Sequence, residues 1–243
     1  MNETRALIAT EAKLLFRDPI SWLAAIALPS VILLIFGAVF PPQPDPALGG
    51  YRWLDLFVPS LLVITTATLG IQTLPIRLAT YREKGVLRRL STTPAHPSRL
   101  LAAQLVIYAA TAVAGMAVLL ITGQIVFGIP LPANPLAYLV AFTLGVAALF
   151  AIGLIIAAFA PSARTATAVA IPMFFVVMFL GGVYLPRYLL PEVLVTIGNY
   201  TPPGVQALTD AWLGSAPQPL ALAAMAAITV VAGAIAVRVF RWE

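Results

Sequence analysis

Six apolar stretches, each long enough to cross a lipid bilayer, restrict what this chain can fold into more than any other feature. They run approximately through residues 20–40, 54–76, 101–127, 136–160, 165–185 and 219–237. A transmembrane helix needs about 20 mainly apolar residues. Charged residues make up 9% of the chain, against about a quarter of a soluble domain. The sequence therefore predicts an all-α membrane protein, with residues 1–243 forming one domain of six transmembrane helices.

The basic residues gather on one side of these stretches. Of the 14 Lys and Arg, only Arg52 and Arg187 fall in loops of the other side. Because Lys and Arg concentrate in cytoplasmic loops, both termini are expected in the cytoplasm. The same distribution accounts for the net charge of +5, so we expect no nucleic-acid partner. A cleaved signal peptide is a weaker interpretation, because the first stretch is long and no A-x-A-like site follows it.

The segments outside the membrane fall into two groups. Residues 1–18 precede the first stretch and are amphipathic, which predicts an interfacial helix along the inner leaflet. Glu11 projects from the apolar face of that helix, and "RDP", which includes Arg17, ends it. Residues 186–218 contain two short apolar pieces broken by Pro and Gly, which predict short re-entrant helices at the outer interface.

A basic loop, residues 80–92, separates the second and third stretches. As one helix from Tyr81 to Leu90, it would carry its basic residues around a small apolar face that also holds Glu83. One interpretation is that the loop only sets the topology and contacts anionic membrane lipids. The other is that it docks a cytoplasmic partner, because an acid on an apolar face needs a cationic partner. We expect this helix and the N-terminal helix to lie close together, with Glu11 and Glu83 each paired with an Arg.

Two motifs carry a resemblance to a known family. "YREKGVLRRLSTTPAHPSRLLAAQ" (81–104) and "GGVYLPRYLLP" (181–191) occur in the order typical of ABC-2 type transporter permeases. The number of spans and the N-terminal helix are also similar, although "YTPPGVQAL" departs from the usual turn of the family. The length is most similar to the daunorubicin and multidrug resistance branch. The resemblance implies a type V exporter-like fold in the bacterial cytoplasmic membrane.

The resemblance also implies partners and sites. A permease of this family pairs with a second permease copy and docks on a separate ABC ATP-binding subunit. The docking residues implied are Tyr81, Arg82, Glu83, Lys84, Gly85, Leu87, Arg88 and Arg89, with Glu11 and Arg17 in the connecting helix. The implied outer gate is Gly181, Gly182, Tyr184 and Pro186.

The chain itself lacks the residues for nucleotide chemistry. A P-loop needs a Gly-Lys pair, and neither lysine follows a glycine. We therefore expect ATP and Mg²⁺ to bind to the partner subunit, with no cofactor in this chain. Cysteine is absent and His96 is the one histidine, so we expect no metal site and no enzymatic activity in this chain alone.

Polar and aromatic residues inside the spans are candidates for a substrate pathway. Thr65, Thr68 and Gln72 share one helical face, and the family's second and fifth spans line its central cavity. The candidates are therefore Thr65, Thr68, Gln72, Phe174, Phe175 and Met178. Met and Phe form adaptable apolar walls, which suit a lipophilic or amphipathic substrate such as a drug or lipid. These side chains can equally serve helix packing alone.

Other functions remain open at this point. A permease for polysaccharide or glycolipid is the nearest alternative. A proton-coupled secondary transporter usually carries an acid or His near the membrane midplane, and none is found there. A membrane enzyme would need a constellation of reactive residues that the spans lack. A scaffold without transport activity is the remaining alternative.

Overall fold

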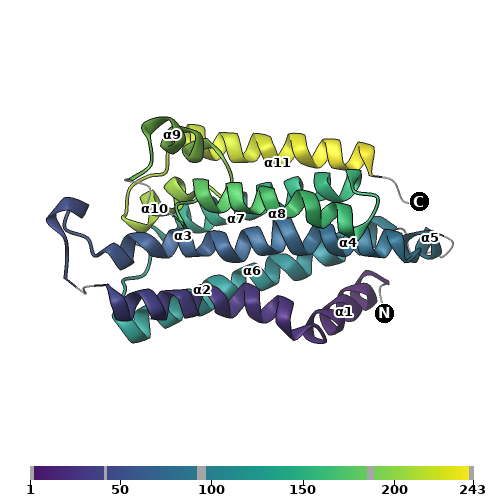
Figure 1. Ribbon diagram of the computed structural model, residues 1–243, viewed down its shortest axis with the longest axis horizontal. Helices are drawn as coiled ribbons and strands as arrows, with labels where there is room; N and C mark the ends of the chain where they lie inside the picture. The colour runs from purple at the N-terminus through teal and green to yellow at the C-terminus, as the bar shows by residue number, and fades with distance from the viewer. Residues whose placement is uncertain (1–2, 41–42, 92–96, 185–188, 241–243) are drawn as a thin grey trace.

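The computed structural model describes residues 3–40, 43–91, 97–184 and 189–240, which form a helical bundle (Figure 1). Its short helices are α1 (Glu3–Phe16), η1 (Pro46–Leu48), α5 (Val86–Ser91), α9 (Glu192–Tyr200) and α10 (Val205–Trp212). Its long helices are α2 (Pro19–Val39), α6 (Pro97–Phe127), α7 (Pro135–Phe159), α8 (Ala163–Leu180) and α11 (Pro219–Val239). α3 (Trp53–Ala67), η2 (Thr68–Thr73) and α4 (Leu74–Glu83) follow one another without a break. Within the described ranges, six helices are long and apolar enough to cross a membrane, which confirms the predicted six-span fold.

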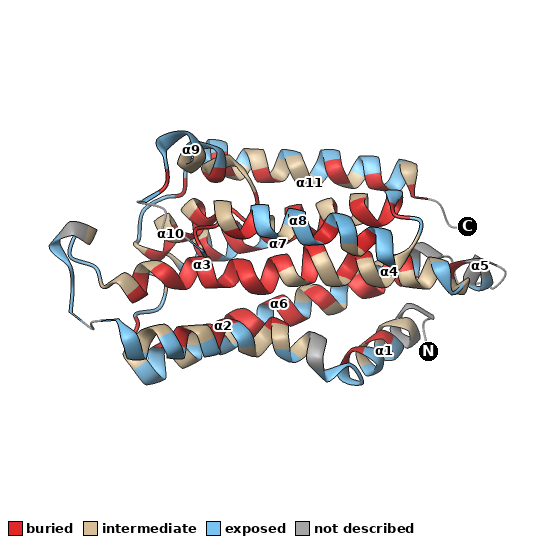
Figure 2. Cartoon of the chain, in the orientation of Figure 1, coloured by how far each residue is buried: buried red, intermediate tan, exposed pale blue. Residues whose placement is uncertain are grey.

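The unbroken helix from Trp53 to Glu83, called the central helix below, is the core of the bundle. In its most apolar window 89% of the residues are buried, against 22–56% in the other five spans. α2 and α6 pack against it and against each other, and α7 and α8 cover its other side. α11 packs along α7. Figure 2 shows the resulting pattern, with buried residues concentrated along the central helix and exposed residues on the outer helices.

The two ends of the bundle differ in composition. α1, α5 and the last turn of α11 lie together at one end, and η1, α9 and α10 lie at the other (Figure 1). The first end, called the basic end below, carries Arg77, Arg82, Lys84, Arg89 and Arg238. The second is called the outer end. The first and last helices thus share one end of the bundle, as the sequence predicts; the membrane side that this end faces remains a prediction.

The basic loop differs from the expected single helix. The central helix continues beyond the predicted boundary at residue 76, to Glu83, and a turn at Lys84 and Gly85 then separates it from α5. Gly85 has φ +67°, a left-handed conformation that residues with a side chain rarely adopt. The chain therefore changes direction at Gly85, and the expected helix from Tyr81 to Leu90 is two helices.

A widened turn and a glycine contact occur in the middle of the central helix. η2 is π-helical, and the Thr73 hydroxyl donates a hydrogen bond to the carbonyl oxygen of Thr68 at 3.0 Å. Such π-helical turns are rare and often lie at functional sites. Beside this turn, Gly153 of α7 lies so close to Gly70 that an added Cβ would clash with the Gly70 carbonyl oxygen. Glycine at both positions therefore lets the two backbones meet, as small residues do in membrane bundles.

We expect Gly153→Ala to destabilise the bundle. The added methyl group would have to displace backbone rather than a flexible side chain, and overpacking of this kind costs about 1–3 kcal/mol. Thermal unfolding in detergent should show a lowered melting temperature. Gly233→Ala is the matched control, because a Cβ on that helical glycine meets no atom within 4 Å. Equal melting temperatures for the two variants would contradict the close contact.

Candidate functional site

A buried carboxylate joins α1 to the central helix at the basic end. Glu11 is 6% exposed, and the Tyr81 hydroxyl donates to its Oε1 at 2.9 Å. Arg77 Nε lies 3.8 Å from Glu11 Oε2 and donates to the Tyr81 hydroxyl oxygen at 3.3 Å. Burying a carboxylate is costly unless cationic and hydrogen-bonding groups compensate it. The predicted pairing of Glu11 with an Arg is therefore confirmed, and Arg17 lies exposed just beyond the end of α1.

The next two residues along the central helix bind the turn between α7 and α8. Arg82 Nη1 donates to the carbonyl oxygens of Ala157 and Ala160, at 2.9 and 2.6 Å, where α7 ends. Glu83 Oε2 accepts a hydrogen bond from the backbone N–H of Ala163, the first residue of α8, at 3.3 Å. We call these interactions the Arg82–Glu83 clamp. Among the described side chains Glu83 pairs with no Arg, contrary to the prediction; its partner there is a helix N-terminus.

The signs of the two charges match the helix ends that they contact. Carbonyl groups at a helix C-terminus attract cations, and N–H groups at an N-terminus attract anions. Arg82 also lies over the ring of Phe240, with its guanidinium carbon 5.0 Å from the ring centroid. The clamp thus ties the end of the central helix to α7, to α8 and to the residue that follows α11.

The structure separates the expected docking residues into two groups. Tyr81 and Arg82 contact the bundle, Leu87 is buried, and Gly85 makes the turn. Glu83 is exposed but holds the N-terminus of α8. Lys84 and Arg89 are exposed, and the side chain of Arg88 lies outside the described residues. The surface open to a partner is therefore smaller than the motif suggests.

A groove of about 570 Å³ lies beside the central helix, between its middle and the basic end. We call it the lateral groove. Leu14, Asp18 and Ala24 of the α1–α2 region form one wall. The central helix contributes Thr68, Gln72, Thr73, Ile76, Arg77, Thr80, Tyr81 and Lys84. The groove therefore combines hydroxyl and amide groups near mid-span with charged groups at its basic end.

The structure divides the candidate pathway residues. Thr68 and Gln72 share the lateral groove, whereas Thr65 is fully buried and packs against Gly115 of α6. Phe175 of α8 is 54% exposed and stacks on Tyr184, with centroids 5.9 Å apart. Of the other pathway candidates, Phe174 is half-buried and Met178 is buried. In the expected outer gate, Gly181 and Gly182 are buried. Pro186 lies outside the described residues.

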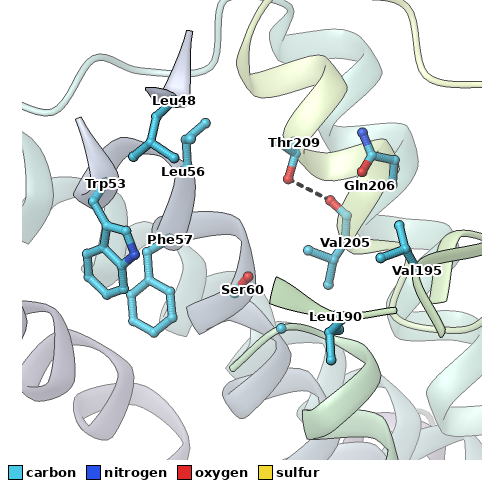
Figure 3. A pocket seen from close by; sticks show the side chains of 11 residues that line it. Leu48, Trp53, Leu56, Phe57, Ser60, Leu190, Val195, Val205, Gln206 and Thr209 are labelled. Atoms are coloured by element: carbon cyan, nitrogen blue, oxygen red, sulfur yellow. Dashed lines mark hydrogen bonds between the residues drawn. The ribbon is translucent and has the colours of Figure 1, made fainter. Parts of the chain in front are cut away.

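A second cavity, of about 400 Å³, lies at the outer end (Figure 3). We call it the outer cavity. It is lined by residues of η1, α3, α9 and α10 together with Gly182 and Leu190. Figure 3 shows Trp53 and Phe57 of α3 on one side, Val205 and Thr209 of α10 on the other, and Ser60 between them. No sequence motif predicts this cavity, because the residues that line it come from four separate segments.

An ion pair beside the outer cavity fixes the start of the central helix. Arg52 donates to both carboxylate oxygens of Asp55, from Nε at 2.9 Å and from Nη2 at 2.7 Å. Its Nη1 also donates to the carbonyl oxygen of Phe127, the last residue of α6, at 2.9 Å. The hydrogen bond with Asp55 raises the pKa of Arg52 above its ordinary value. At both ends of the central helix, an Arg side chain therefore binds the C-terminus of a neighbouring helix.

Most of the chain matches a known protein family. A family model described as "ABC-2 type transporter" matches residues 2–205, which include five of the six spans and α9 and end at the first residue of α10. None of the curated proteins compared with this chain matches it.

Cysteine labelling should distinguish the lateral groove from the helix interface. The chain contains no cysteine, so each introduced thiol can be followed alone. In purified protein we expect a water-soluble maleimide to label Thr68→Cys and Gln72→Cys several-fold faster than Thr65→Cys, because only the first two border the groove. Labelling is measured by mass spectrometry. Equal rates at all three positions would contradict the groove.

Proposed function

Because this chain belongs to the ABC-2 type transporter family, we propose that it is the transmembrane subunit of an ATP-driven exporter. The family works with an ABC ATP-binding subunit, and no Gly-Lys pair for a P-loop occurs in this sequence. In the proposed assembly a second permease copy completes the pathway, and ATP with Mg²⁺ binds to the partner ATPase. The basic end faces the cytoplasm of a bacterial cell, in agreement with the concentration of Lys and Arg there.

The lateral groove is the observation that supports a transport role most directly. A groove along a membrane-spanning helix needs polar lining if it is to carry more than lipid chains. Here Thr68, Gln72 and Thr73 lie at the widened turn of the central helix, and Ile76 adds apolar surface. A lining of mixed character suits a lipophilic or amphipathic substrate, such as a drug or lipid, better than a sugar chain. The π-helical turn supports the same assignment.

The clamp suggests that different residues at the basic end contact the ATPase and transmit its movement. We assign contact with the ATPase to the exposed pair Lys84 and Arg89, and transmission of its movement to Arg82 and Glu83. A displacement of the α4–α5 corner would be passed to α7 and α8 through the hydrogen bonds to Ala157, Ala160 and Ala163. Binding of the ATPase and coupling to transport then depend on different residues.

Co-reconstitution with the cognate ATPase tests the proposal. We expect the assembled complex in liposomes to move a fluorescent amphipathic drug in an ATP-dependent manner. Lys84→Glu combined with Arg89→Glu should abolish co-purification of the ATPase, because both charges are reversed on the docking surface. Arg82→Ala should leave co-purification intact and reduce transport at least tenfold per ATP hydrolysed, because α7 and α8 no longer follow the central helix.

Two controls separate the outcomes. Arg238→Ala removes an exposed basic residue of α11 at the same end and should change neither ATPase binding nor transport. The thermal stability of Arg82→Ala identifies any general unfolding. Loss of ATPase binding in Arg82→Ala would show that Arg82 itself belongs to the docking surface. Absence of ATP-dependent transport in the wild-type complex would refute the proposed exporter function.

A further inference from the structure

The outer cavity has the composition of a ligand site rather than of a packing defect. Trp53 and Phe57 stack at its wall, with ring centroids 4.5 Å apart. Its volume of about 400 Å³ lies within the range of small-molecule sites, roughly 300–1,000 Å³. Its described lining comes from η1, α3, α9 and α10, together with Gly182 and Leu190. The outer cavity is also separate from the lateral groove, since the two share no described residue.

Ser60 is the polar group that points to a ligand. Its side chain lines the cavity and the residue is 5% exposed. Hydroxyl groups in membrane helices usually bond a carbonyl oxygen one turn earlier, and Thr66, Thr111 and Thr229 do so here. Among the described residues, the Ser60 hydroxyl has no hydrogen-bond partner. The Ser60 hydroxyl is not among the fully buried polar atoms that lack a partner, because it is open to the cavity that it lines. It is therefore available to bond a ligand or water there.

The charges around the cavity define the class of ligand. Among the residues that the structure describes, no charged side chain lines it. Arg52 is paired with Asp55, and the Asp210 carboxylate, which does not line the cavity, accepts a hydrogen bond from the Gln206 amide at 2.7 Å. A charged ligand would be buried against Ser60 and aromatic rings without an opposite charge, which is unfavourable. The site therefore fits a neutral molecule.

We propose that the outer cavity binds a neutral amphipathic molecule through a hydroxyl or carbonyl group. That group pairs with the Ser60 hydroxyl, and the apolar part lies against Trp53, Phe57 and Val205. Thr209 is unavailable as a donor because its hydroxyl bonds the Val205 carbonyl oxygen at 2.9 Å (Figure 3). The inference goes beyond the proposed function, because binding at this site requires neither ATP nor a partner subunit.

Photolabelling of the purified permease in lipid nanodiscs tests the site. The probe is a diazirine derivative of octanol, which is neutral and carries one hydroxyl group. We expect it to label peptides of α3 and α10, and octanol to compete. Ser60→Ala should raise the octanol concentration needed for half-maximal competition about fivefold, as expected for one lost neutral hydrogen bond. Ser60→Phe should remove the labelling, because the ring fills the cavity.

The controls decide between this site and general partitioning into the membrane. Ser30→Ala is the matched variant, because Ser30 is a buried serine of α2 that lacks a partner and lines none of the described cavities. It should label and compete as the wild type does. A cationic octyl ammonium competitor should fail. The site is refuted if Ser60→Ala competes like Ser30→Ala, if the cationic competitor is as effective as octanol, or if labelling is confined to lipid-facing helices.

Discussion

The structure depends on one helix whose ends bind the ends of its neighbours. At the outer end Arg52 joins Asp55 to the C-terminus of α6. At the basic end Arg82 and Glu83 hold the C-terminus of α7 and the N-terminus of α8. Helix ends carry unpaired backbone groups that lipid cannot satisfy. Charged side chains at the two ends of the central helix therefore satisfy some of these groups and link it to three other spans.

Between its two ends, the central helix is held by close packing rather than by charge. In a bilayer, moving an apolar side chain from lipid to a helix interface gains little free energy. Helix association therefore depends on close backbone packing and on hydrogen bonds. The contact of Gly70 with Gly153 provides that approach. The same region contains the π-helical turn and the polar part of the lateral groove. The helix thus combines a tight contact on its α7 side with a polar surface on its α1–α2 side.

Sequence reasoning predicted the spans and the ends better than it predicted the sites. Each apolar stretch is long enough to identify a span by itself, so the six spans could be derived. The Lys and Arg residues are numerous enough to show that α1 and α11 share one end of the bundle. Glu11 was identified because an acid on an apolar face requires a partner, and it pairs with Arg77. The hydrogen-bond partners of Arg82 and Glu83 could not be derived, because they are backbone atoms about 75–80 residues away in the sequence.

Local geometry accounts for the remaining differences. The wheel that grouped Thr65 with Thr68 and Gln72 assumes a regular α-helix, whereas the π-helical turn begins at Thr68 and Thr65 packs on Gly115. The outer cavity depends on how η1, α9 and α10 fold over α3, and no short motif encodes that arrangement. Gly85 was a sequence indication of the turn, since only glycine readily takes φ +67°. The amphipathic pattern on both sides of it nevertheless favoured one continuous helix.

The central claim is that the Arg82–Glu83 clamp holds the basic end of the central helix rigidly against the α7–α8 turn. Lys84 and Arg164 are exposed, so Lys84→Cys and Arg164→Cys can carry spin labels on the two sides of the clamp. Double electron–electron resonance in nanodiscs then measures the distance between the two labels. We predict one narrow distance distribution, which Arg82→Ala broadens and Arg238→Ala does not. A broad distribution in the parent protein, or no change in Arg82→Ala, would contradict the claim.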